Sequence, residues 1–314
     1  MKNPDIKIDL VYTWVDGNDP VWRKKRDSFR GSSSEAGKSG EGRFANNDEL
    51  KFSLRSVEKF APWINRIFIV TDGQSPDWLN TQNPRVKIID HSEILPPEAL
   101  PTFNSTVIEH ALHNIPGLSQ HFLYANDDMF FGRSVSPSDF FMEDGTPIVR
   151  FNRRPFRKFT LWIKKNMMGK KLSNYNLTIH NTALMVEKRY GKYIGNKTHH
   201  NIDAYTQRDY ASTFETFRRE IEATFENHFR SDNDVQRNIY SYVPILEGKA
   251  KVKFVTQKES FRCHIDNQRN FNRLESSSPL LFCLNDSEYA NDIHRRNVKE
   301  FLERRFPSKS SFEK

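Results

Sequence analysis

The first half of the sequence alternates continuously apolar runs with segments whose apolar residues recur at helical spacing. Short runs of β-branched and aromatic residues are typical of buried strands. Strands that are separated by helices pair in parallel, because a parallel connection needs a long crossover. We therefore expect an α/β fold, with a Rossmann-like, mostly parallel sheet and helices on both faces. The expected strands are residues 6–14, 66–71, 85–89 and 121–125, and the expected helices are residues 48–60 and 107–115.

The second half is more helical and more basic. Residues 210–229 are amphipathic, and one stripe of this segment carries Phe214, Phe217, Ile221 and Phe225, which we expect in the core. The other elements expected here are helices over residues 235–246 and 288–306 and a strand over residues 251–256 that adds to the sheet. In the first half, the Gly- and Ser-rich residues 31–43 predict a mobile loop, which is either a lid over a site or a solvated insertion.

Composition limits the class of protein. With 314 residues, of which 13% are aromatic, the chain favours a polar surface around an aromatic-rich core over disorder. No apolar run approaches the roughly 20 residues of a membrane-spanning helix, and the N-terminus lacks the apolar segment of a signal peptide. Cys263 and Cys283 are the two cysteines, a number that suits a reducing compartment. We expect a soluble cytoplasmic protein.

The net charge of +8 suits an anionic partner or none. Residues 150–171 concentrate Lys and Arg among aromatic residues. This pattern fits single-stranded nucleic acid, an anionic bilayer or an anionic polymer, and a solvated basic face is the plain alternative. No GxGxxG or GxxxxGK[ST] motif occurs, so the sequence gives no support to dinucleotide or P-loop chemistry.

Three expected strands end in carboxylates. Asp16 follows the first, Asp72 the second, and Asn126, Asp127 and Asp128 the last. Ligands of parallel α/β sheets bind beyond the carboxyl ends of the strands. Asp127 and Asp128 therefore predict a site for Mg²⁺ or Mn²⁺ on phosphates. Asx turns and helix caps are the alternative.

Histidine and arginine residues of the second half add weaker candidates. His200 suits a general base, because its ordinary pKa lies near neutrality. Arg230 suits a phosphate, which a guanidinium binds in bidentate fashion. His180 is a further histidine whose role stays open. The spacings of zinc ligands are absent from the sequence.

The same segments resemble the Stealth family of hexose-1-phosphate transferases, which includes bacterial capsular polysaccharide phosphotransferases and an animal N-acetylglucosamine-1-phosphotransferase. Four conserved regions of that family are similar to DLVYTWVDGNDP (9–20), to segments of residues 47–141 that include FLYANDDMFFG, to HHNIDAY and FRSDNDV within residues 199–242, and to FCLND and FLERRFPSKSSFE within residues 280–313.

The resemblance implies a glycosyltransferase-A-like fold and a reaction. A UDP-hexose or UDP-N-acetylhexosamine donor gives its sugar-1-phosphate to a hydroxyl of a glycan acceptor, forming a phosphodiester and releasing UMP, in capsule or cell-surface polysaccharide synthesis. Residues 1–150 would bind the nucleotide sugar and residues 151–314 would complete the active site. The two halves would form one integrated catalytic domain.

The roles that the resemblance implies fall on residues of all four regions. Asp127 and Asp128 would hold the metal, and Arg230 would clamp the transferred phosphoryl group. His200 would be the base, with Asp16 as the second candidate. The donor pocket would be completed by Asp19, Asn126, Asn285 and Asp286.

Two other functions stay open at this point. A conventional UDP-sugar glycosyltransferase would use the same fold and metal but release UDP. A nucleic-acid-binding module would use the basic stretch and leave the strand-end acids unexplained; we expect no nucleic-acid partner. On the transferase hypothesis, the basic stretch and the final helix either rest on anionic lipid at the inner face of a bacterial membrane or hold the phosphorylated glycan.

Overall fold

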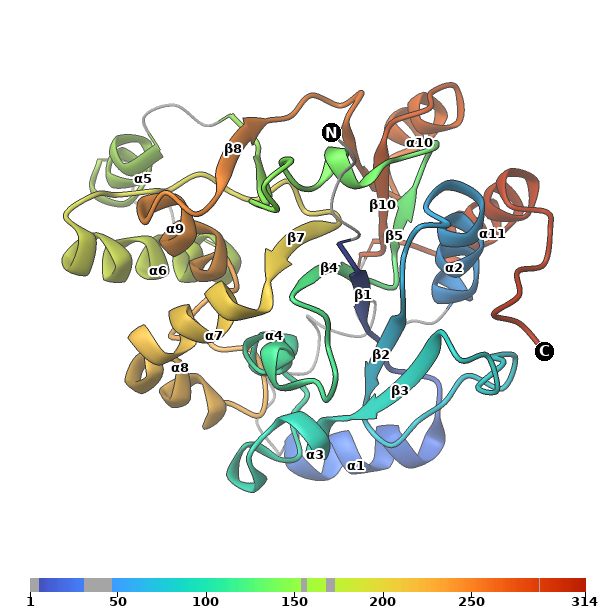
Figure 1. Ribbon diagram of the computed structural model, residues 1–314, viewed down its shortest axis with the longest axis horizontal. Helices are drawn as coiled ribbons and strands as arrows, with labels where there is room; N and C mark the ends of the chain where they lie inside the picture. Colours follow the sequence, from blue (N-terminus) through green and yellow to red (C-terminus); the bar gives the residue numbers. More distant parts are fainter. Residues whose placement is uncertain (1–5, 31–46, 154–156, 168–172, 288) are drawn as a thin grey trace.

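The computed structural model describes residues 6–30, 47–153, 157–167, 173–287 and 289–314 (Figure 1). At its centre is a five-stranded sheet in the order β3-β2-β1-β4-β7. β1 pairs in parallel with β2 and β4, β2 pairs in parallel with β3, and β7 is antiparallel to β4. The α/β class and the four strands expected in the first half are confirmed. The bounds are β1 (Ile8–Thr13), β2 (Ile67–Thr71), β3 (Val86–Asp90), β4 (His121–Asn126) and β7 (Asp203–Thr206).

Helices cover both faces of this sheet. Successive side chains of a strand point to opposite faces, so the apolar strands place apolar side chains on both. Val11 of β1 belongs to a core that helices α4, α6, α7, α8 and α9 share. Leu10 and Tyr12 belong to a second core, with α2 and a smaller sheet. The bounds are α2 (Glu49–Phe60), α4 (Ser105–His110), α6 (Asn174–Tyr190), α7 (Gln207–Thr216), α8 (Arg218–Phe225) and α9 (Ile239–Leu246).

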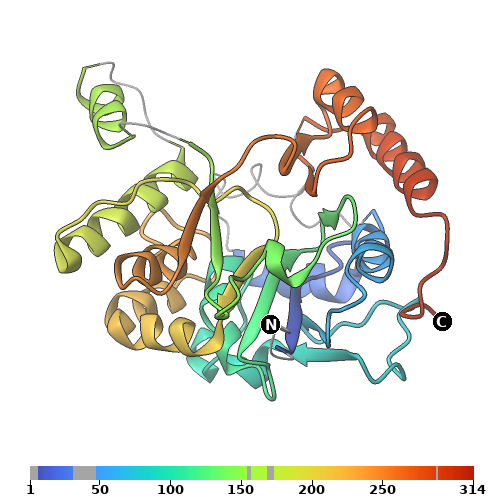
Figure 2. The ribbon, with the colours of Figure 1, turned by 45° about the horizontal axis from the view of Figure 1, so that its top comes forward.

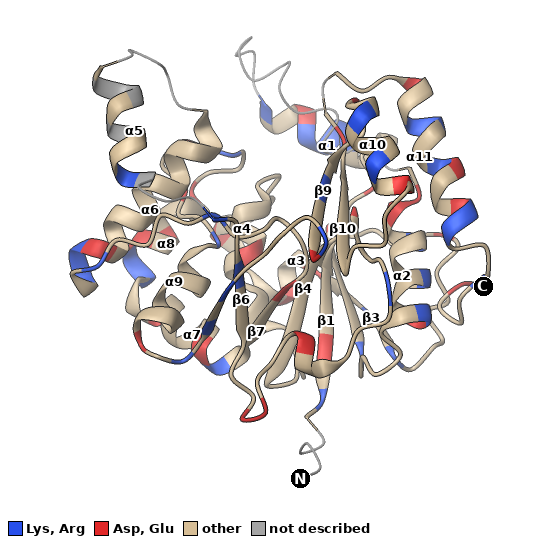
Figure 3. Ribbon diagram, turned by 90° about the horizontal axis from the view of Figure 1, so that it is seen from above, with Lys and Arg blue, Asp and Glu red and all other residues tan. Residues whose placement is uncertain are grey.

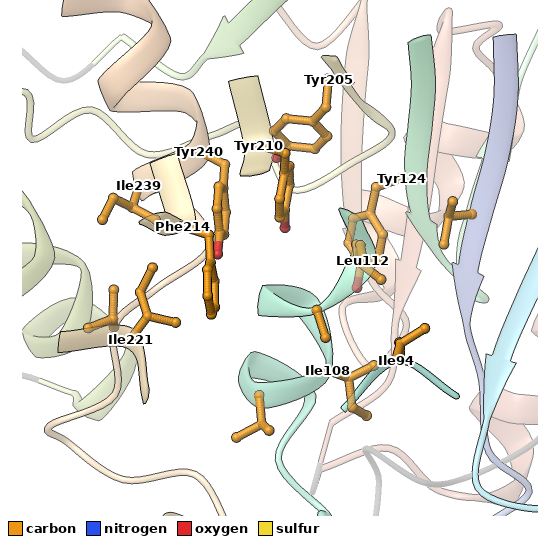
Figure 4. Close-up of a cluster of buried hydrophobic side chains, with 14 of the residues drawn as sticks. Ile94, Ile108, Leu112, Tyr124, Tyr205, Tyr210, Phe214, Ile221, Ile239 and Tyr240 are labelled. Carbon is orange, nitrogen blue, oxygen red and sulfur yellow. The ribbon is translucent and has the colours of Figure 1, made fainter. Parts of the chain in front are cut away.

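Aromatic rings fill the core between α7, α8 and α9 (Figure 4). Tyr210 and Tyr240 stack with their ring centroids 3.5 Å apart. The expected apolar stripe is confirmed, since all of its members are buried: Phe214, Phe217, Ile221 and Phe225. The single helix expected over residues 210–229 is wrong, because Phe217 leaves helical geometry (φ −122°, ψ 26°) and separates α7 from α8.

Other elements differ from the expectations at their ends or in their partners. The helix expected from residue 235 begins at Ile239. The last helix, α11 (Asp292–Arg305), begins after Asn291, whose side chain accepts a hydrogen bond from the backbone amide of His294. The helix expected over residues 107–115 is α4 followed by a 3₁₀ turn, Leu112–Asn114. The strand expected at residue 251 exists as β8 (Lys251–Phe254), but it pairs with β6 (Ile148–Phe151) and not with the central sheet.

A second sheet that the sequence did not predict starts directly beyond β4. Its strands are β5 (Met129–Phe131), β10 (Leu281–Asn285) and β9 (Ser260–His264), in the order β5-β10-β9. β5 is antiparallel to β10, and β10 is parallel to β9. Since only Asp127 and Asp128 separate β4 from β5, the turn that joins the two strands lies where the two sheets meet.

The remaining elements surround these sheets. They are α1 (Pro20–Arg30), α3 (His91–Ile94), α5 (Arg157–Asn166), α10 (Gln268–Glu275) and the 3₁₀ turns Pro97–Ala99 and Pro137–Asp139. Helix α5 stands away from the sheets, at the end of the molecule opposite α10 and α11 (Figure 2). Among the residues that the structure describes, no helix has both the length and the apolar character that crossing a bilayer requires.

The two halves of the chain interleave. Strand β7 of the second half joins β4 of the first, and β10 joins β5. This arrangement favours the single integrated domain, with residues 1–150 and 151–314 as its halves, which stays a prediction. The loop expected over residues 31–43 lies outside the described residues.

Candidate active site

The turn between β4 and β5 holds Asp127 and Asp128 at the carboxyl end of the central sheet. Strand β10 supports the turn from the other side, because the backbone amide of Leu284 donates to the carbonyl oxygen of Asp128 (2.9 Å). The thiol of Cys283 donates to Oδ2 of Asp128 at 3.2 Å. Figure 3 shows α1 and α10 beyond this end of the two sheets. The acids of the last expected strand end therefore lie between both sheets, where ligands of such folds bind.

Three carboxyl groups share this region. Burial raises the pKa of Asp127 well above its ordinary value, and the charges of Asp128 and Glu49 raise it further. Burial likewise raises the pKa of Asp128 to about 6, against the opposing effects of the Cys283 hydrogen bond and the Arg262 charge. Burial raises the pKa of Glu49 to about 7. Without a cation, ionised carboxylates here are unfavourable.

The residues of this turn fit a divalent cation. Oδ1 of Asp128 is buried and has no hydrogen-bond partner in the described part of the chain. Carboxylate oxygens are the ligands that Mg²⁺ and Mn²⁺ prefer. Within the described ranges, no three His, Cys, Asp or Glu side chains form a metal site by themselves. Asp127 and Asp128 therefore suit a metal that takes its remaining ligands from a bound phosphate group and water, as is usual for Mg²⁺.

His200 lies before β7 with its backbone in the left-handed region, at φ 55°. This conformation is uncommon for a residue with a side chain and costs about 1–3 kcal/mol. Its Nε2 is buried and has no hydrogen-bond partner among the described residues. Burial lowers the pKa of His200 well below its ordinary value, and the charges of Arg262 and Arg237 lower it further. The imidazole is therefore neutral at neutral pH and can accept a proton.

The neighbouring histidine has a different role. Nδ1 of His199 lies 2.8 Å from the hydroxyl of Ser260, and Nε2 lies 3.1 Å from Oδ1 of Asp203. Asp203 also accepts a hydrogen bond from Arg237 at 2.8 Å. These bonds fix His199 inside the fold and leave His200 as the histidine that faces the charged groups.

Arg230 lies in the same electrostatic neighbourhood. Its side chain is exposed and donates to the hydroxyl of Ser105. Its positive charge lowers the pKa of His200. Arg230 thus acts on His200 through its charge, and the catalytic roles of both residues stay predictions.

Arg262 of β9 is the residue that the sequence analysis missed. Its Nε donates to Oδ1 of Asn285 at 2.9 Å, across the parallel pair of β9 and β10. Its charge lowers the pKa of Asp128 and also that of His200. Arg262 therefore connects the carboxylate turn to the histidine. Nothing in the local sequence, SFRCH, marks this arginine, since its position depends on a strand pairing that was not foreseen.

The first strand-end acids, Asp16 and Asp19, have local partners. Gln74 accepts from the backbone amide of Asp16 (2.9 Å) and donates to Oδ2 of Asp19 (2.9 Å). Oδ1 of Asp16 accepts from the amide of Asn18 at 2.9 Å. Oδ1 of Asp19 accepts from the amide of Val21 at 2.8 Å. The bonds from Gln74 and this amide lower the pKa of Asp19. These contacts correspond to the alternative of turns and helix caps, and the catalytic and binding roles of the two residues stay predictions.

The other expected donor-pocket residues are held in three ways. Oδ1 of Asn126 accepts from the Tyr124 hydroxyl at 2.8 Å. Asn285 orients Arg262. Asp286 accepts two hydrogen bonds from Arg295, at 2.9 and 3.3 Å, which balance its charge. Asn285 therefore contacts Arg262, whereas Asp286 forms a salt bridge with the last helix, and the donor-pocket roles of all these residues stay predictions.

Family models match the first half of the chain. The model described as Stealth protein conserved region 1 matches residues 7–34, and the model of conserved region 2 matches residues 43–149. These ranges agree with the first two regions of the resemblance, while the assignments within residues 199–242 and 280–313 stay predictions.

Curated relatives match nearly the whole chain. A capsular polysaccharide phosphotransferase of Haemophilus influenzae is 31% identical over 96% of this chain and 84% of its own length. An exopolysaccharide phosphotransferase of Streptomyces coelicolor is 37% identical over 98% of this chain; the chain spans about half, 52%, of that relative. Among solved structures, the galactosyltransferase LgtC aligns over 96% of both chains at 12% identity, with a TM-score of 0.47, a likeness too distant to carry an argument. The chain belongs to the Stealth family, whose relatives named above are polysaccharide phosphotransferases.

Proposed function

We propose that the protein transfers sugar-1-phosphate from a UDP-hexose or UDP-N-acetylhexosamine to a hydroxyl of a glycan acceptor. The observation that carries this proposal is that the charged groups of the candidate site influence one another's pKa values. Arg262 acts on both Asp128 and His200, and Arg230 acts on His200. A half-buried carboxylate pair, two guanidinium groups and a neutral imidazole are groups that suit phosphoryl transfer, because its catalysis is mostly positioning and electrostatics.

Each group has a defined task in this reaction. The acceptor oxygen attacks the phosphorus that bears the sugar, and its proton passes to Nε2 of His200. The bond between this phosphorus and the bridging oxygen breaks, so that UMP leaves and a phosphodiester remains. Arg230 and Arg262 bind the oxygens of the transferred phosphoryl group. Asp127 and Asp128 would hold Mg²⁺, which neutralises charge on the diphosphate when bound.

The nucleotide product tests the reaction. The protein is incubated with a panel of UDP-sugars, Mg²⁺ and short capsular oligosaccharides, and the released nucleotide is identified by chromatography. UMP release that depends on the acceptor is the expected result. Release of UDP alone would support the second candidate, a conventional glycosyltransferase, and would refute the proposal.

The assignment of His200 as the base has a test of its own, because the backbone conformation at this position tolerates glycine. Glycine adopts a φ of 55° without strain, so His200→Gly removes the imidazole without an expected loss of fold stability. We expect UMP release to fall by a factor of about 10²–10⁴ and added imidazole to restore part of it. The control is His294→Gly, the same substitution at a histidine of α11 outside the site. Full activity of His200→Gly would remove His200 from the mechanism.

We also propose that the protein acts at the inner face of a membrane through anionic lipid. Helix α5 supports this location, because Phe159 is 61% exposed and Met167, directly after the helix, is 72% exposed. Exposed apolar side chains in a basic segment suit an anionic bilayer surface. The test is flotation with vesicles that contain anionic lipid: wild type is expected to float and Phe159→Ser to float less. Equal recovery with neutral vesicles would contradict the proposal.

A further inference from the structure

A concave surface lies at the amino-terminal edge of the small sheet, outside the candidate active site. It is a cavity of about 460 Å³. Its walls come from Lys258 before β9, from Ser276 and Ser278 before β10, from Arg133 after β5 and from Arg273 of α10. No residue named above as part of the active site lines it.

The charge of this cavity is entirely positive. Arg133, Lys258 and Arg273 are exposed, and no Asp or Glu is among the described lining residues. Two glutamates lie near these cations in the sequence, and each already pairs with a different cation. Glu259 pairs with Lys253 at 2.6 Å, and Glu275 of α10 pairs with Arg304 at 2.6 Å. Uncompensated cations in a hollow attract an anion.

The cations are held in place by the fold. Arg273 donates to the side chain of Gln257 and lies over the Phe261 ring, 5.9 Å from its centroid. Arg133 follows Gly132, where the chain passes very close to Pro279: a Cβ at Gly132 would lie 2.2 Å from the Pro279 carbonyl oxygen. This approach keeps Arg133 beside the serines that precede β10. A guanidinium above an aromatic ring, in a cavity that serine residues also line, suits a ligand that is both phosphorylated and rich in hydroxyls.

The cavity and the active site lie at opposite ends of the same strands. β9 and β10 are parallel, so the cavity lies before Leu281 whereas Arg262 contacts Asn285 at the other end. Four residue steps at about 3.3 Å each separate Leu281 from Asn285, roughly 13 Å. An extended chain molecule that lay along the edge strand β9, whose Arg262 and His264 are exposed, would reach both places.

We propose that this cavity binds an internal phosphodiester group of the acceptor glycan while the end of that glycan reacts at the active site. The proposal rests on the proposed function, whose product carries a phosphodiester, and it also takes this product to be the acceptor of the next round. A short acceptor without phosphate does not reach the cavity. The cavity thus distinguishes a growing polymer from a first acceptor.

Direct binding tests the proposal without any turnover. The probe is a linear oligosaccharide of hexose phosphate repeats, titrated calorimetrically into wild type and into a variant with Arg133→Ala, Lys258→Ala and Arg273→Ala. A matched variant removes three exposed cations of α6, α7 and α8: Lys188, Arg208 and Arg219. We expect at least tenfold weaker binding in the cavity variant and a change below twofold in the matched variant.

Further ligands separate the other occupants. A neutral oligosaccharide of equal length is expected to bind at least tenfold more weakly than the phosphorylated one. Equal binding of the two, or equal loss in both variants, overturns the proposal. An oligonucleotide of equal charge that binds more tightly than the glycan, and loses this binding in the cavity variant, identifies a nucleic-acid surface and also overturns it.

Kinetics separate the failure of this inference from failure of the proposed function. With the phosphorylated acceptor, the cavity variant is expected to raise KM about tenfold and to leave kcat unchanged. With a short neutral acceptor, both parameters stay at their wild-type values. Wild type that releases no UMP refutes the proposed function, whereas unchanged KM in the cavity variant refutes only the cavity. Thermal unfolding of the variants at the wild-type midpoint excludes misfolding as the cause.

Discussion

Arg262 offers the most direct test of the active site, because it links the two groups that the reaction needs. Replacing it by glutamine removes a positive charge beside both Asp128 and His200 and removes the charged partner of Asn285. In other enzymes, loss of one preorganised donor to a transition-state oxyanion lowers kcat by about 10²–10³, or about 2.7–4 kcal/mol. We expect a loss of this size in kcat/KM for Arg262→Gln.

The pH dependence of this variant has a defined sign. His200 must be neutral to accept a proton, and the Arg262 charge holds the pKa of His200 down. Without that charge the pKa rises toward its ordinary value, so the acidic limb of the kcat/KM profile moves to higher pH. Arg262→Lys keeps the charge but not the fork that binds Asn285, and is expected to lose about tenfold in rate while keeping the limb close to its wild-type position.

The assay is initial UMP release over about pH 5 to pH 9, which covers the acidic limb of such a profile. Arg269→Gln, an exposed arginine of α10, is the control and is expected to behave as wild type. Arg262→Gln with a rate within threefold of wild type would refute the role of Arg262. An acidic limb that moved to lower pH would refute the electrostatic link to His200.

Three further predictions concern binding and stability. Mg²⁺ with UDP is expected to raise the thermal midpoint of wild type but not of Asp128→Asn, by preferential binding to the folded state; an equal rise in the variant would exclude Asp128 from the metal site. Arg55→Ala removes the two hydrogen bonds, at 2.8 and 2.7 Å, that the Glu313 carboxylate accepts from Arg55, and leaves those from Ser310; it is expected to cost about 1–3 kcal/mol in urea unfolding at neutral pH. Burial alone would raise the pKa of Glu313, but the bonds from Arg55 hold it below its ordinary value, so this stabilisation is present above about pH 4.5 and is lost as the pH falls through the folded-state pKa; a cost that did not shrink in acid would contradict this. Gly132→Ala forces the backbone away from Pro279 and is expected to cost about 1–3 kcal/mol in the same assay, and a loss below about 0.5 kcal/mol would contradict the close approach.

The sequence predicted the central sheet because its strands are continuously apolar. Such runs occur when both faces of a strand are buried, and β1, β2 and β4 are buried almost throughout. The small sheet escaped prediction for the opposite reason. β5 has three residues, and β9 alternates buried and exposed positions within five residues. Strands this short form through pairing with distant segments, which a local pattern does not encode.

The same reasoning explains which site residues could be foreseen. Asp127 and Asp128 follow a strong strand signal, so their place at the carboxyl edge could be predicted from topology. Arg262 could not, because its place depends on the pairing of β9 with β10. The contact between Asp286 and Arg295 was likewise hidden, since it needs the start of α11 to be known.

Two residues were candidates for the base, and their surroundings separate them. A general base needs a lone pair that faces the acceptor hydroxyl. Oδ1 of Asp16 already accepts a backbone hydrogen bond, and the backbone of Asp16 is held by Gln74. Nε2 of His200 has no such partner in the described structure, although it is buried. A buried nitrogen without a partner and a strained φ of 55° both oppose folding. Because the fold keeps both at one residue, the simplest physical reason is that a bound acceptor supplies the missing partner, which favours His200 over Asp16.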